Sequence, residues 1–338
     1  MRKDTLRLAL PSKGELEKGA QDFLKASGLG VHRPNSRQYV AKIPSAPQIE
    51  VLFQRVTDIL RKVDEGSADL GVTGYDVVME EGGGRGHDDI VIILDRLGFG
   101  GCRLVLAVPE SWVDVSSIED LADLTALYKQ QGREFRIATK FHNLTRQWLY
   151  EKGISHFSIV SAHGAMEAAP SMGYADMIAD ITSSGTTLRE NRLKQIMGGT
   201  ILYSEACLIG NRRLLLESQD KLDTVRLMLE LMEARLRAKP FISITANICS
   251  DTPTAIAQHL NEAGELGGLR GPTIAQVYPK TLHEAWYAVT IVVQQSKLLQ
   301  AVDNLRQIGG TDITVMSPTY LFDSKSWNYE TLLEKLHS

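Results

Sequence analysis

The stretch ADMIADITSSGTTLRENRL, residues Ala175–Leu193, predicts a strand, a turn and the start of a helix in succession. Its apolar run ends in an acid, Asp180, and five of the six residues at 182–187 carry hydroxyl groups. Thr187 and Glu190 stand in T-x-x-E spacing, in which the threonine hydroxyl accepts from an N–H of the first helical turn and the glutamate reaches back to the cap. We therefore expect a capping box to begin a helix here.

This turn has the chemistry of a phosphate site. The N-terminus of a helix offers backbone N–H donors and a partial positive charge, and a glycine lets an oxyanion come close to the backbone. Hydroxyl-rich caps are common, so an ordinary capped loop is the simpler explanation of the turn when it is taken alone. The candidate phosphate-binding residues are Thr182, Ser183, Ser184, Gly185, Thr186 and Thr187.

Short apolar runs alternate with amphipathic stretches through the first two thirds of the chain, which is typical of strands joined by crossover helices. The pattern of residues 1–110 recurs in 111–195, and an apolar run then returns the chain to the first unit. We expect lobe boundaries at 1–110 with 196–215 and at 111–195, and an active cleft between the two α/β lobes. The expected strands are Thr5–Leu10, Ile49–Phe53, Ala68–Val72, Cys102–Val108, Arg136–Thr139, Phe157–Val160, Ala175–Ile181 and Thr200–Ile209.

The last third of the chain predicts a separate domain. A helical pattern over Leu214–Arg237 ends at Lys239-Pro240, because a proline disfavours helix for the residue before it. We expect a linking helix within 216–240. The order that follows is strand, helix, strand, strand, helix, strand, which is the ferredoxin-like βαββαβ order. It predicts a ferredoxin-like domain over 241–325 and a short tail helix within 326–338.

Composition limits the class of protein. The chain has 338 residues with 37 Lys and Arg against 41 Asp and Glu, and its net charge of −4 argues against nucleic acid as a partner. Apolar residues make up 43%, and no apolar run is long enough to span a membrane. Three widely spaced cysteines form no metal-binding pattern. With no export signal at the start, we expect a cytoplasmic protein without a membrane partner.

Charged and aromatic residues follow the first predicted strands. Lys13 is a point charge suited to phosphate, and Arg55 can grip a phosphate through two hydrogen bonds, although each is more simply a solvated surface charge when taken alone. Asp69 and Asp76 bracket GVTGY, which we expect to form a turn for a nucleotide or a metal-bound diphosphate. Asp76 is equally explained as a helix N-cap. Tyr75 either stacks on adenine or packs.

The stretch from Glu167 to Leu188 resembles the signature of the ATP phosphoribosyltransferase family, with Gly173 and Asp180 in register. Beyond Pro240, GLRGPTIAQV, WYAVTIVV and LRQIGGTDITVMSPTYLF are similar to the histidine-binding regulatory domain of the long form. The resemblance covers nearly the whole chain. Further pieces match in the expected order, namely LPSKG (Leu10–Gly14), FQRVTDIL (Phe53–Leu60), ADLGVTGYD (Ala68–Asp76), LGFGGCRL (Leu97–Leu104) and RIATKFHNLTRQWL (Arg136–Leu149).

The resemblance implies a two-lobed, periplasmic-binding-protein-like catalytic core with a C-terminal ferredoxin-like regulatory domain. It also implies displacement of pyrophosphate from phosphoribosyl pyrophosphate by N1 of the adenine of ATP, the first step of histidine biosynthesis. Mg²⁺ would arrive on the pyrophosphate, with no metal site built by the protein alone. The resemblance further implies feedback inhibition by histidine. It also implies a homohexamer that exchanges with dimers.

The resemblance also implies roles for single residues. Ser184–Thr187 would hold the 5-phosphate of the sugar, while Asp180 and Glu167 would accept from ribose hydroxyls or orient the hydroxyls around them. It favours phosphate binding by Lys13 and Arg55, so Lys13, Arg55, Glu167 and Asp180 are the expected catalytic residues. The chain departs from the family's pattern at Glu15, where many members have arginine.

The expected histidine site lies around Gly271 and Thr273, although Gly271-Pro272 is equally explained as a simple turn. Two other classes of protein fit the same organisation. A two-lobed solute-binding protein would need an export signal, and a catalytically silent regulatory subunit would share the fold. Pyrophosphate release from ATP and phosphoribosyl pyrophosphate distinguishes both of them from an enzyme.

Overall fold

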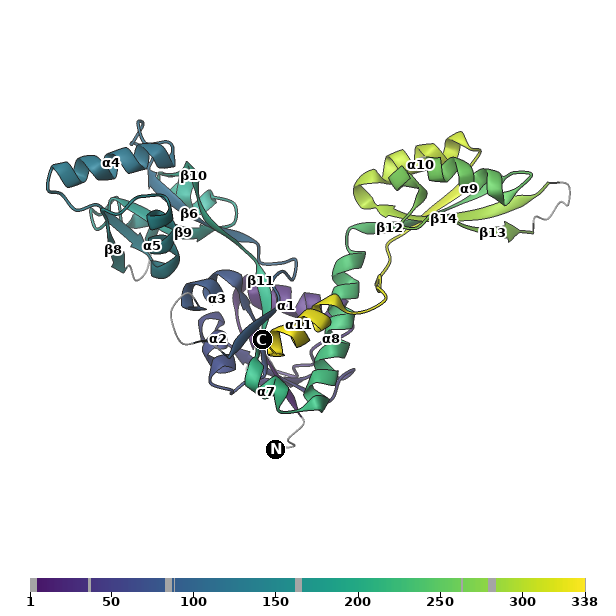
Figure 1. Cartoon of the computed structure of the whole chain (residues 1–338), viewed down its shortest axis with the longest axis horizontal. Coiled ribbons are helices and arrows are strands. Elements are labelled where there is room, and N and C mark those ends of the chain that lie inside the picture. The colour runs from purple at the N-terminus through teal and green to yellow at the C-terminus, as the bar shows by residue number, and fades with distance from the viewer. Residues whose placement is uncertain are drawn as a thin grey trace. The chain divides into compact units, whose positions relative to one another are not determined.

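The computed structural model describes residues 5–35, 38–82, 87, 89–161, 166–262, 264–278 and 284–337. The chain forms two compact units, one of Met1–Val225 with Asn328–Ser338 and one of Arg226–Trp327. The larger unit contains two α/β lobes, each built on its own sheet, which we call lobe I and lobe II (Figure 1). Within the described ranges, no helix combines the length and the apolar character that a membrane span requires.

Lobe I is built on a six-stranded sheet in the order β2-β3-β1-β4-β11-β5. Strands β3 and β4 pair with β1 in parallel, whereas β11 is antiparallel to β4 and to β5. The central strands are almost fully buried, as expected for a sheet with helices on its faces. The elements are β1 (Leu6–Pro11), α1 (Gly14–Ala26), β2 (Val40–Lys42), β3 (Ile49–Gln54), α2 (Val56–Asp64), β4 (Leu70–Gly74), α3 (Tyr75–Gly82), β5 (Ile90–Leu94) and β11 (Ala206–Asn211).

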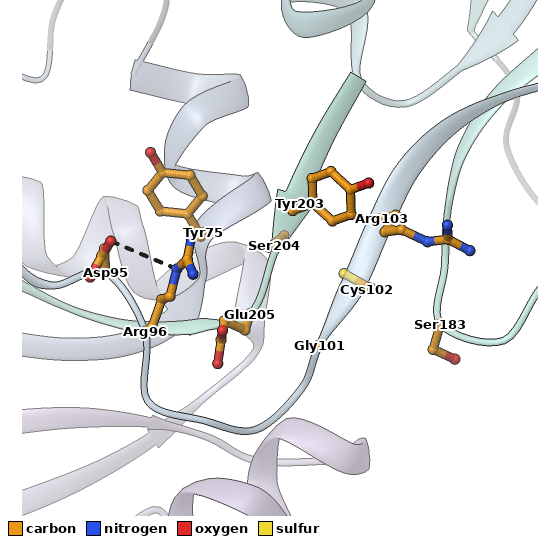
Figure 2. Close-up of a pocket in the computed structure, with 10 residues that line it drawn as sticks. All are labelled: Tyr75, Asp95, Arg96, Gly101, Cys102, Arg103, Ser183, Tyr203, Ser204 and Glu205. Carbon is orange, nitrogen blue, oxygen red and sulfur yellow. Dashed lines mark ion pairs between the residues drawn. The ribbon is translucent and has the colours of Figure 1, made fainter. Parts of the chain in front are cut away.

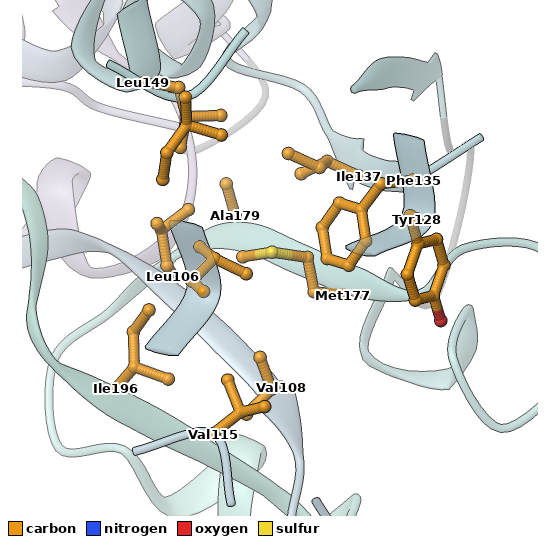
Figure 3. Close-up of a cluster of buried hydrophobic side chains, with 12 residues drawn as sticks. Leu106, Val108, Val115, Tyr128, Phe135, Ile137, Leu149, Met177, Ala179 and Ile196 are labelled. Atoms are coloured by element: carbon orange, nitrogen blue, oxygen red, sulfur yellow. The ribbon is translucent and has the colours of Figure 1, made fainter. Parts of the chain in front are cut away.

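Lobe II is built on a five-stranded sheet in the order β10-β6-β9-β7-β8. Its core gathers around Leu106, Phe135 and Met177 (Figure 3). The ring of Tyr128 meets that of Phe135 edge to face, with 5.2 Å between centroids, which is a favourable aromatic geometry. The elements are β6 (Cys102–Pro109), α4 (Ile118–Gln130), β7 (Arg136–Thr139), α5 (His142–Glu151), β8 (Ser158–Ser161), η1 (Met166–Ala168), β9 (Met177–Thr182), α6 (Thr186–Glu190) and β10 (Leu193–Ser204).

The chain crosses between the lobes twice, but not at the expected boundaries near residues 110 and 196, because β6 and β10 both belong to the sheet of lobe II. The first crossing is the segment 95–101 between β5 and β6, and the second is Glu205, between β10 and β11. Phe99 of the first crossing packs against α1 at Gly19, where a side chain would collide with the ring. The N–H of Gly98 donates to the carboxylate of Glu205 at 2.8 Å, which ties the two crossings together.

Two local predictions were wrong. Thr200–Ile209 is not one strand, because Glu205 separates β10 from β11 and the two belong to different sheets. The pattern over Leu214–Arg237 is divided into α7 (Arg212–Leu216) and α8 (Gln219–Ala238). In each case apolar periodicity is continuous across the break, so the pattern alone does not reveal it.

The smaller unit has the predicted ferredoxin-like order. Its sheet runs β13-β14-β12-β15 with every neighbouring pair antiparallel, and alternate residues of β12 are buried under α9 and α10. The predicted tail helix is α11 (Trp327–His337), whose Lys335 donates to the carbonyl of Ile92 at 2.8 Å. The elements of the sheet domain are β12 (Phe241–Cys249), α9 (Pro253–Glu262), η2 (Gly264–Gly267), β13 (Thr273–Val277), β14 (Trp286–Gln294), η3 (Gln295–Lys297), α10 (Leu298–Gln307) and β15 (Thr311–Met316).

A buried ion cluster secures α8 to the sheet of lobe I. The carboxylate of Asp69, which is fully buried just before β4, accepts from the backbone N–H of Arg7 at 2.7 Å and from the ammonium of Lys221 at 2.8 Å. The Arg7 guanidinium pairs with the same carboxylate at 3.1 Å. Burial alone raises the pKa of Asp69, but the hydrogen bonds from Arg7 and Lys221 outweigh it and hold the pKa below its usual value.

We predict that Lys221→Met destabilises lobe I by about 3 kcal/mol, because it leaves a buried carboxylate with one cation fewer. Lys62→Met is the matched control. Lys62 forms an ion pair with Glu65 that is far more exposed, so its loss should cost less than about 1 kcal/mol. Hydrogen exchange of the amides of β1 and β4 measures both changes, and equal protection in the two variants would contradict the assignment.

Candidate functional site

The strands of lobe I bring predicted site residues to one edge of its sheet. Lys13 follows β1, Arg55 follows β3 and Tyr75 follows β4, and these three strands are parallel. The carboxyl ends of parallel strands lie at the same edge, where α/β sheets bind ligands. Lys13 and Arg55 are exposed there, as a phosphate ligand requires.

A pocket of about 480 Å³ lies where the two crossings meet (Figure 2). Tyr75 comes to it from lobe I and Ser183 from lobe II, while the crossings and the adjoining strand ends supply the rest of its wall. The pocket therefore lies between the edges of the two sheets. Its lining residues are Tyr75, Asp95, Arg96, Gly101, Cys102, Arg103, Ser183, Tyr203, Ser204 and Glu205.

Two arginines of this pocket, Arg96 and Arg103, were not predicted as site residues. Arg96 lies in the first crossing with Asp95 at 4.0 Å, and Arg103 is paired with Tyr203 across β6 and β10. The sequence contains a weak indication that both belong to the site, since they lie in or beside LGFGGCRL, one of the stretches that carry the family resemblance. Which face of the junction they occupy depends on the order of the strands, and periodicity does not give that order.

Asp76 is buried at the start of α3 and is hydrogen-bonded to Ser204, the last residue of β10, directly before the second crossing. Its carboxylate accepts from the hydroxyl of Ser204 at 2.6 Å, and the same hydroxyl accepts from the N–H of Asp76 at 2.9 Å. Gly74 has no side chain where this carboxylate lies, and a Cβ there would collide with it. Asp76 thus fixes the start of α3 beside Tyr75, and its acceptor capacity is partly used within the protein.

Asp69 is not part of this site. GVTG forms strand β4 and not the predicted turn, so Asp69 and Asp76 lie at opposite ends of a strand. The carboxylate of Asp69 is fully buried and is neutralised by Arg7 and Lys221. The expected strand, Ala68–Val72, ended two residues too early, because β4 continues to Gly74.

The hydroxyl-rich turn of lobe II differs from the predicted capping box. Helix α6 begins at Thr186, its N-cap is Gly185 with a φ of +74°, and Thr187 lies inside the helix. The hydroxyl of Thr182 accepts from the N–H of Gly185 at 2.9 Å, and that of Ser184 accepts from the N–H of Thr186 at 3.3 Å. Glycine alone adopts this φ without strain, and with Gly185 as N-cap the helix begins earlier than it would with Thr187 as the cap.

Two carboxylates and a lysine lie beside this turn. Asp180 is near the end of β9, Glu167 is in η1 and Lys140 follows β7. Burial raises the pKa of Asp180, the N–H of Ile181 lowers it, the charge of Glu167 raises it and the charge of Lys140 lowers it. Lys140 was not predicted as a site residue, although it directly follows the predicted strand Arg136–Thr139, much as Lys13 follows the first strand.

The two predicted regulatory residues lie in the smaller unit. Gly271 has a φ of +109° and Thr273 is exposed at the start of β13, an edge strand. In the described part of the chain, no group of three or more His, Cys, Asp or Glu side chains is placed to hold a metal ion. Asp180 and Glu167 interact electrostatically, and two carboxylates would leave most ligands of a divalent metal ion to water and phosphate.

Known proteins of one family match most of the chain. The family model described as ATP phosphoribosyltransferase matches residues 55–233, and the model described as HisG, C-terminal domain matches residues 238–318. ATP phosphoribosyltransferase 2, chloroplastic, of Arabidopsis thaliana is 40% identical over 99% of this chain and 81% of its own length. ATP phosphoribosyltransferase of Brucella melitensis is 46% identical over 62% of this chain and 91% of its own length.

A solved structure adds a likeness in three dimensions. The ATP phosphoribosyl transferase (HisG:HisZ) complex from Thermotoga maritima aligns over 68% of this chain and 99% of that chain. The alignment has a TM-score of 0.51 and 27% sequence identity.

We predict opposite shifts in the pKa of Asp180 in two variants. Glu167→Gln lowers it, because a neighbouring negative charge is removed, and Lys140→Met raises it, because a positive charge is removed. Glu190→Gln on α6 is the control and should leave the value unchanged. Titration of the carboxyl carbon by NMR measures all three, and shifts of the same sign in the first two variants would refute the arrangement.

Proposed function

The chain belongs to the ATP phosphoribosyltransferase family, and on that premise we propose that the reaction takes place at the junction of its two lobes. As a phosphoribosyltransferase of this family, it joins N1 of ATP to phosphoribosyl pyrophosphate and releases pyrophosphate, the first step of histidine biosynthesis. The single observation that supports the proposed place is the pocket in which strand ends of both lobes meet.

The reaction depends mainly on the positioning of the two substrates. The N1 lone pair forms the new bond to the anomeric carbon of the sugar, while the bond from that carbon to the pyrophosphate oxygen breaks and its electron pair leaves with pyrophosphate. N1 carries no proton that must be removed first, so no catalytic base is required. Two polyanions must be held with their reacting atoms in line, and charge neutralisation and proximity supply the rate.

Lobe II is the proposed site of the sugar donor. The 5-phosphate would lie on the turn of Thr182, Ser183, Ser184, Gly185, Thr186 and Thr187, whose hydroxyls and first helical N–H groups can donate to it. Helix α6 has only five residues, so the individual donors matter more than a helix dipole. Asp180 and Glu167 would accept from the ribose hydroxyls, with Lys140 balancing their charge.

Lobe I is the proposed site of the nucleotide and of the leaving group. Lys13 and Arg55 are exposed at the carboxyl edge of its sheet and would bind phosphate groups, and Tyr75 would stack on adenine. Arg96 and Arg103 add positive charge to the pocket wall between the lobes. Asp76 would act indirectly, by fixing the start of α3 through Ser204.

Mg²⁺ is the proposed metal. When bound, it would neutralise the pyrophosphate and make it a better leaving group, with Asp180 and Glu167 as the carboxylates available to it and its waters. We also propose a reducing compartment, because Cys102, Cys207 and Cys249 are all free thiols. The cytoplasm is our default, and the two Arabidopsis relatives are named as chloroplastic.

Histidine is the proposed feedback inhibitor, binding the smaller unit near Gly271 and Thr273. To inhibit, it must bind one arrangement of the protein better than another, since equal affinity shifts no equilibrium. The match of residues 238–318 to the family's C-terminal model supports a regulatory role for this unit. A homohexamer that exchanges with dimers is proposed on the same basis.

We predict that a Thr187→Ala, Gly185→Val double variant lowers kcat/KM for the sugar donor on the order of a hundredfold, because it removes a donor and strains the turn at a positive φ. Ser111→Ala, beyond the opposite end of β6, is the control. Pyrophosphate release measures the rate, and circular dichroism checks that the fold is kept. Unchanged release would refute the assignment of the turn.

For regulation, we predict that Thr273→Val raises the histidine concentration needed for half inhibition on the order of tenfold, through the loss of one hydroxyl contact. The control is Thr314→Val, on β15 at the other edge of the same sheet. Rates are measured as pyrophosphate release across a histidine titration. If both variants keep the inhibition of the unmodified chain, the proposed pocket is wrong.

A further inference from the structure

Helix α3 carries contacts beyond those of the pocket. At its start, the N–H of Tyr75 donates to the carbonyl of Glu205 at 2.9 Å, and Asp76 is bonded to Ser204. About one helical turn further on, the side chain of Glu80 extends from lobe I and contacts α5 of lobe II. One helix of lobe I therefore contacts a crossing at one end and the other lobe near its other end.

The contact of Glu80 is a helix cap supplied from the opposite lobe. Its two carboxylate oxygens accept from the N–H of Asn143 at 2.9 Å and from the N–H of Leu144 at 3.0 Å. In return, the side-chain amide of Asn143 donates to the carbonyl of Glu80 at 3.0 Å. The first N–H groups of a helix lack partners within it, and an anionic acceptor there is favourable.

Helix α5 has no comparable cap of its own. Its N-cap residue, Phe141, makes no side-chain cap hydrogen bond, and the first turn contains no acidic residue. This differs from α4 in the same lobe, where Ser117 and Asp120 form a capping box. The start of α5 thus depends on lobe I for its anionic partner.

The capped turn lies directly beside the proposed donor site. Lys140 precedes α5 by two residues, and the short link is fixed by the N–H of Phe141 donating to the hydroxyl of Thr139 at 2.9 Å. Lys140 is the cation that acts on Asp180. Any movement of the start of α5 therefore moves a charge that faces the carboxylates of lobe II.

We propose that Glu80 is a positioning residue: by capping α5 it holds the lobe II half of the site, with Lys140 and Asp180, at a fixed distance from the lobe I half at Tyr75. The inference rests on the proposed division of the donor and the nucleotide between the lobes. Glu80 touches neither substrate. It acts on the reaction by limiting the arrangements that the two lobes sample, which is the proximity contribution to the rate.

The expected kinetic result is a selective loss of turnover. Glu80→Ala removes both acceptors and lowers kcat on the order of tenfold, while KM for phosphoribosyl pyrophosphate changes less than about twofold, because the donor's own contacts remain. Glu80→Gln keeps one acceptor oxygen but places an amide NH2 group against the second N–H. Its kcat should therefore lie between that of the unmodified chain and that of Glu80→Ala. Glu81→Ala, the exposed neighbour on the same helix, is the control and keeps the kcat of the unmodified chain.

A distance measurement tests the cap without substrate. Fluorescent labels are placed on the full chain through unnatural amino acids at Asp22 of α1 and Asp123 of α4, both exposed, one in each lobe. The unmodified chain and Glu81→Ala should give one narrow distribution of distances. Glu80→Ala should give a broader one, and Glu80→Gln an intermediate width.

The outcomes separate this inference from the proposed function. A distribution in Glu80→Ala as narrow as that of the unmodified chain overturns the positioning role, wherever the donor binds. So does a broadened distribution in which KM for the donor rises while kcat stays constant. A broadened distribution with lowered kcat and constant KM supports it. The assignment of the donor to the turn of lobe II stands or falls separately, on the Thr187→Ala, Gly185→Val variant.

Discussion

The constraint on which the site depends is that parallel strands end together. Three parallel strands of lobe I and three of lobe II each place their following residues at one edge of a sheet. The two crossings join the lobes beside both edges, so loops that are far apart in the sequence meet at one pocket. The buried apolar strands of lobe I position Tyr75 at that pocket, whereas Arg103 and Tyr203 line it from the ends of β6 and β10.

Strand β4 illustrates this separation of roles. Before the strand, Asp69 is fully buried and paired with Arg7 and Lys221, whose hydrogen bonds hold the pKa of its carboxyl below its usual value. After the strand, Asp76 and Tyr75 adjoin the junction of the lobes. At Asp180 the pKa is instead raised above its usual value, because of burial and a neighbouring negative charge. A carboxylate matched by cations stabilises the structure, whereas one that is incompletely matched remains available to a ligand.

Most of the fold follows from the sequence, and most errors lie at its interruptions. The βαββαβ order and the repeated α/β units were predicted because apolar periods of two and of three to four residues are carried by the residues themselves. The break at Glu205 was missed because both flanking runs are apolar, and the cap at Thr187 was wrong because a glycine with positive φ begins the helix earlier. Arg96, Lys140 and Glu80 are brought to the site by tertiary arrangement, so local pattern could not single them out.

The most direct test is a crystal structure of the protein with phosphoribosyl pyrophosphate and Mg²⁺. The account predicts density for the 5-phosphate on the turn formed by residues 182–187, with the ribose hydroxyls facing Asp180 and Glu167. It also predicts that the anomeric carbon points across the junction toward Tyr75. A donor bound with its 5-phosphate elsewhere, and with the turn carrying no ligand, would contradict the account.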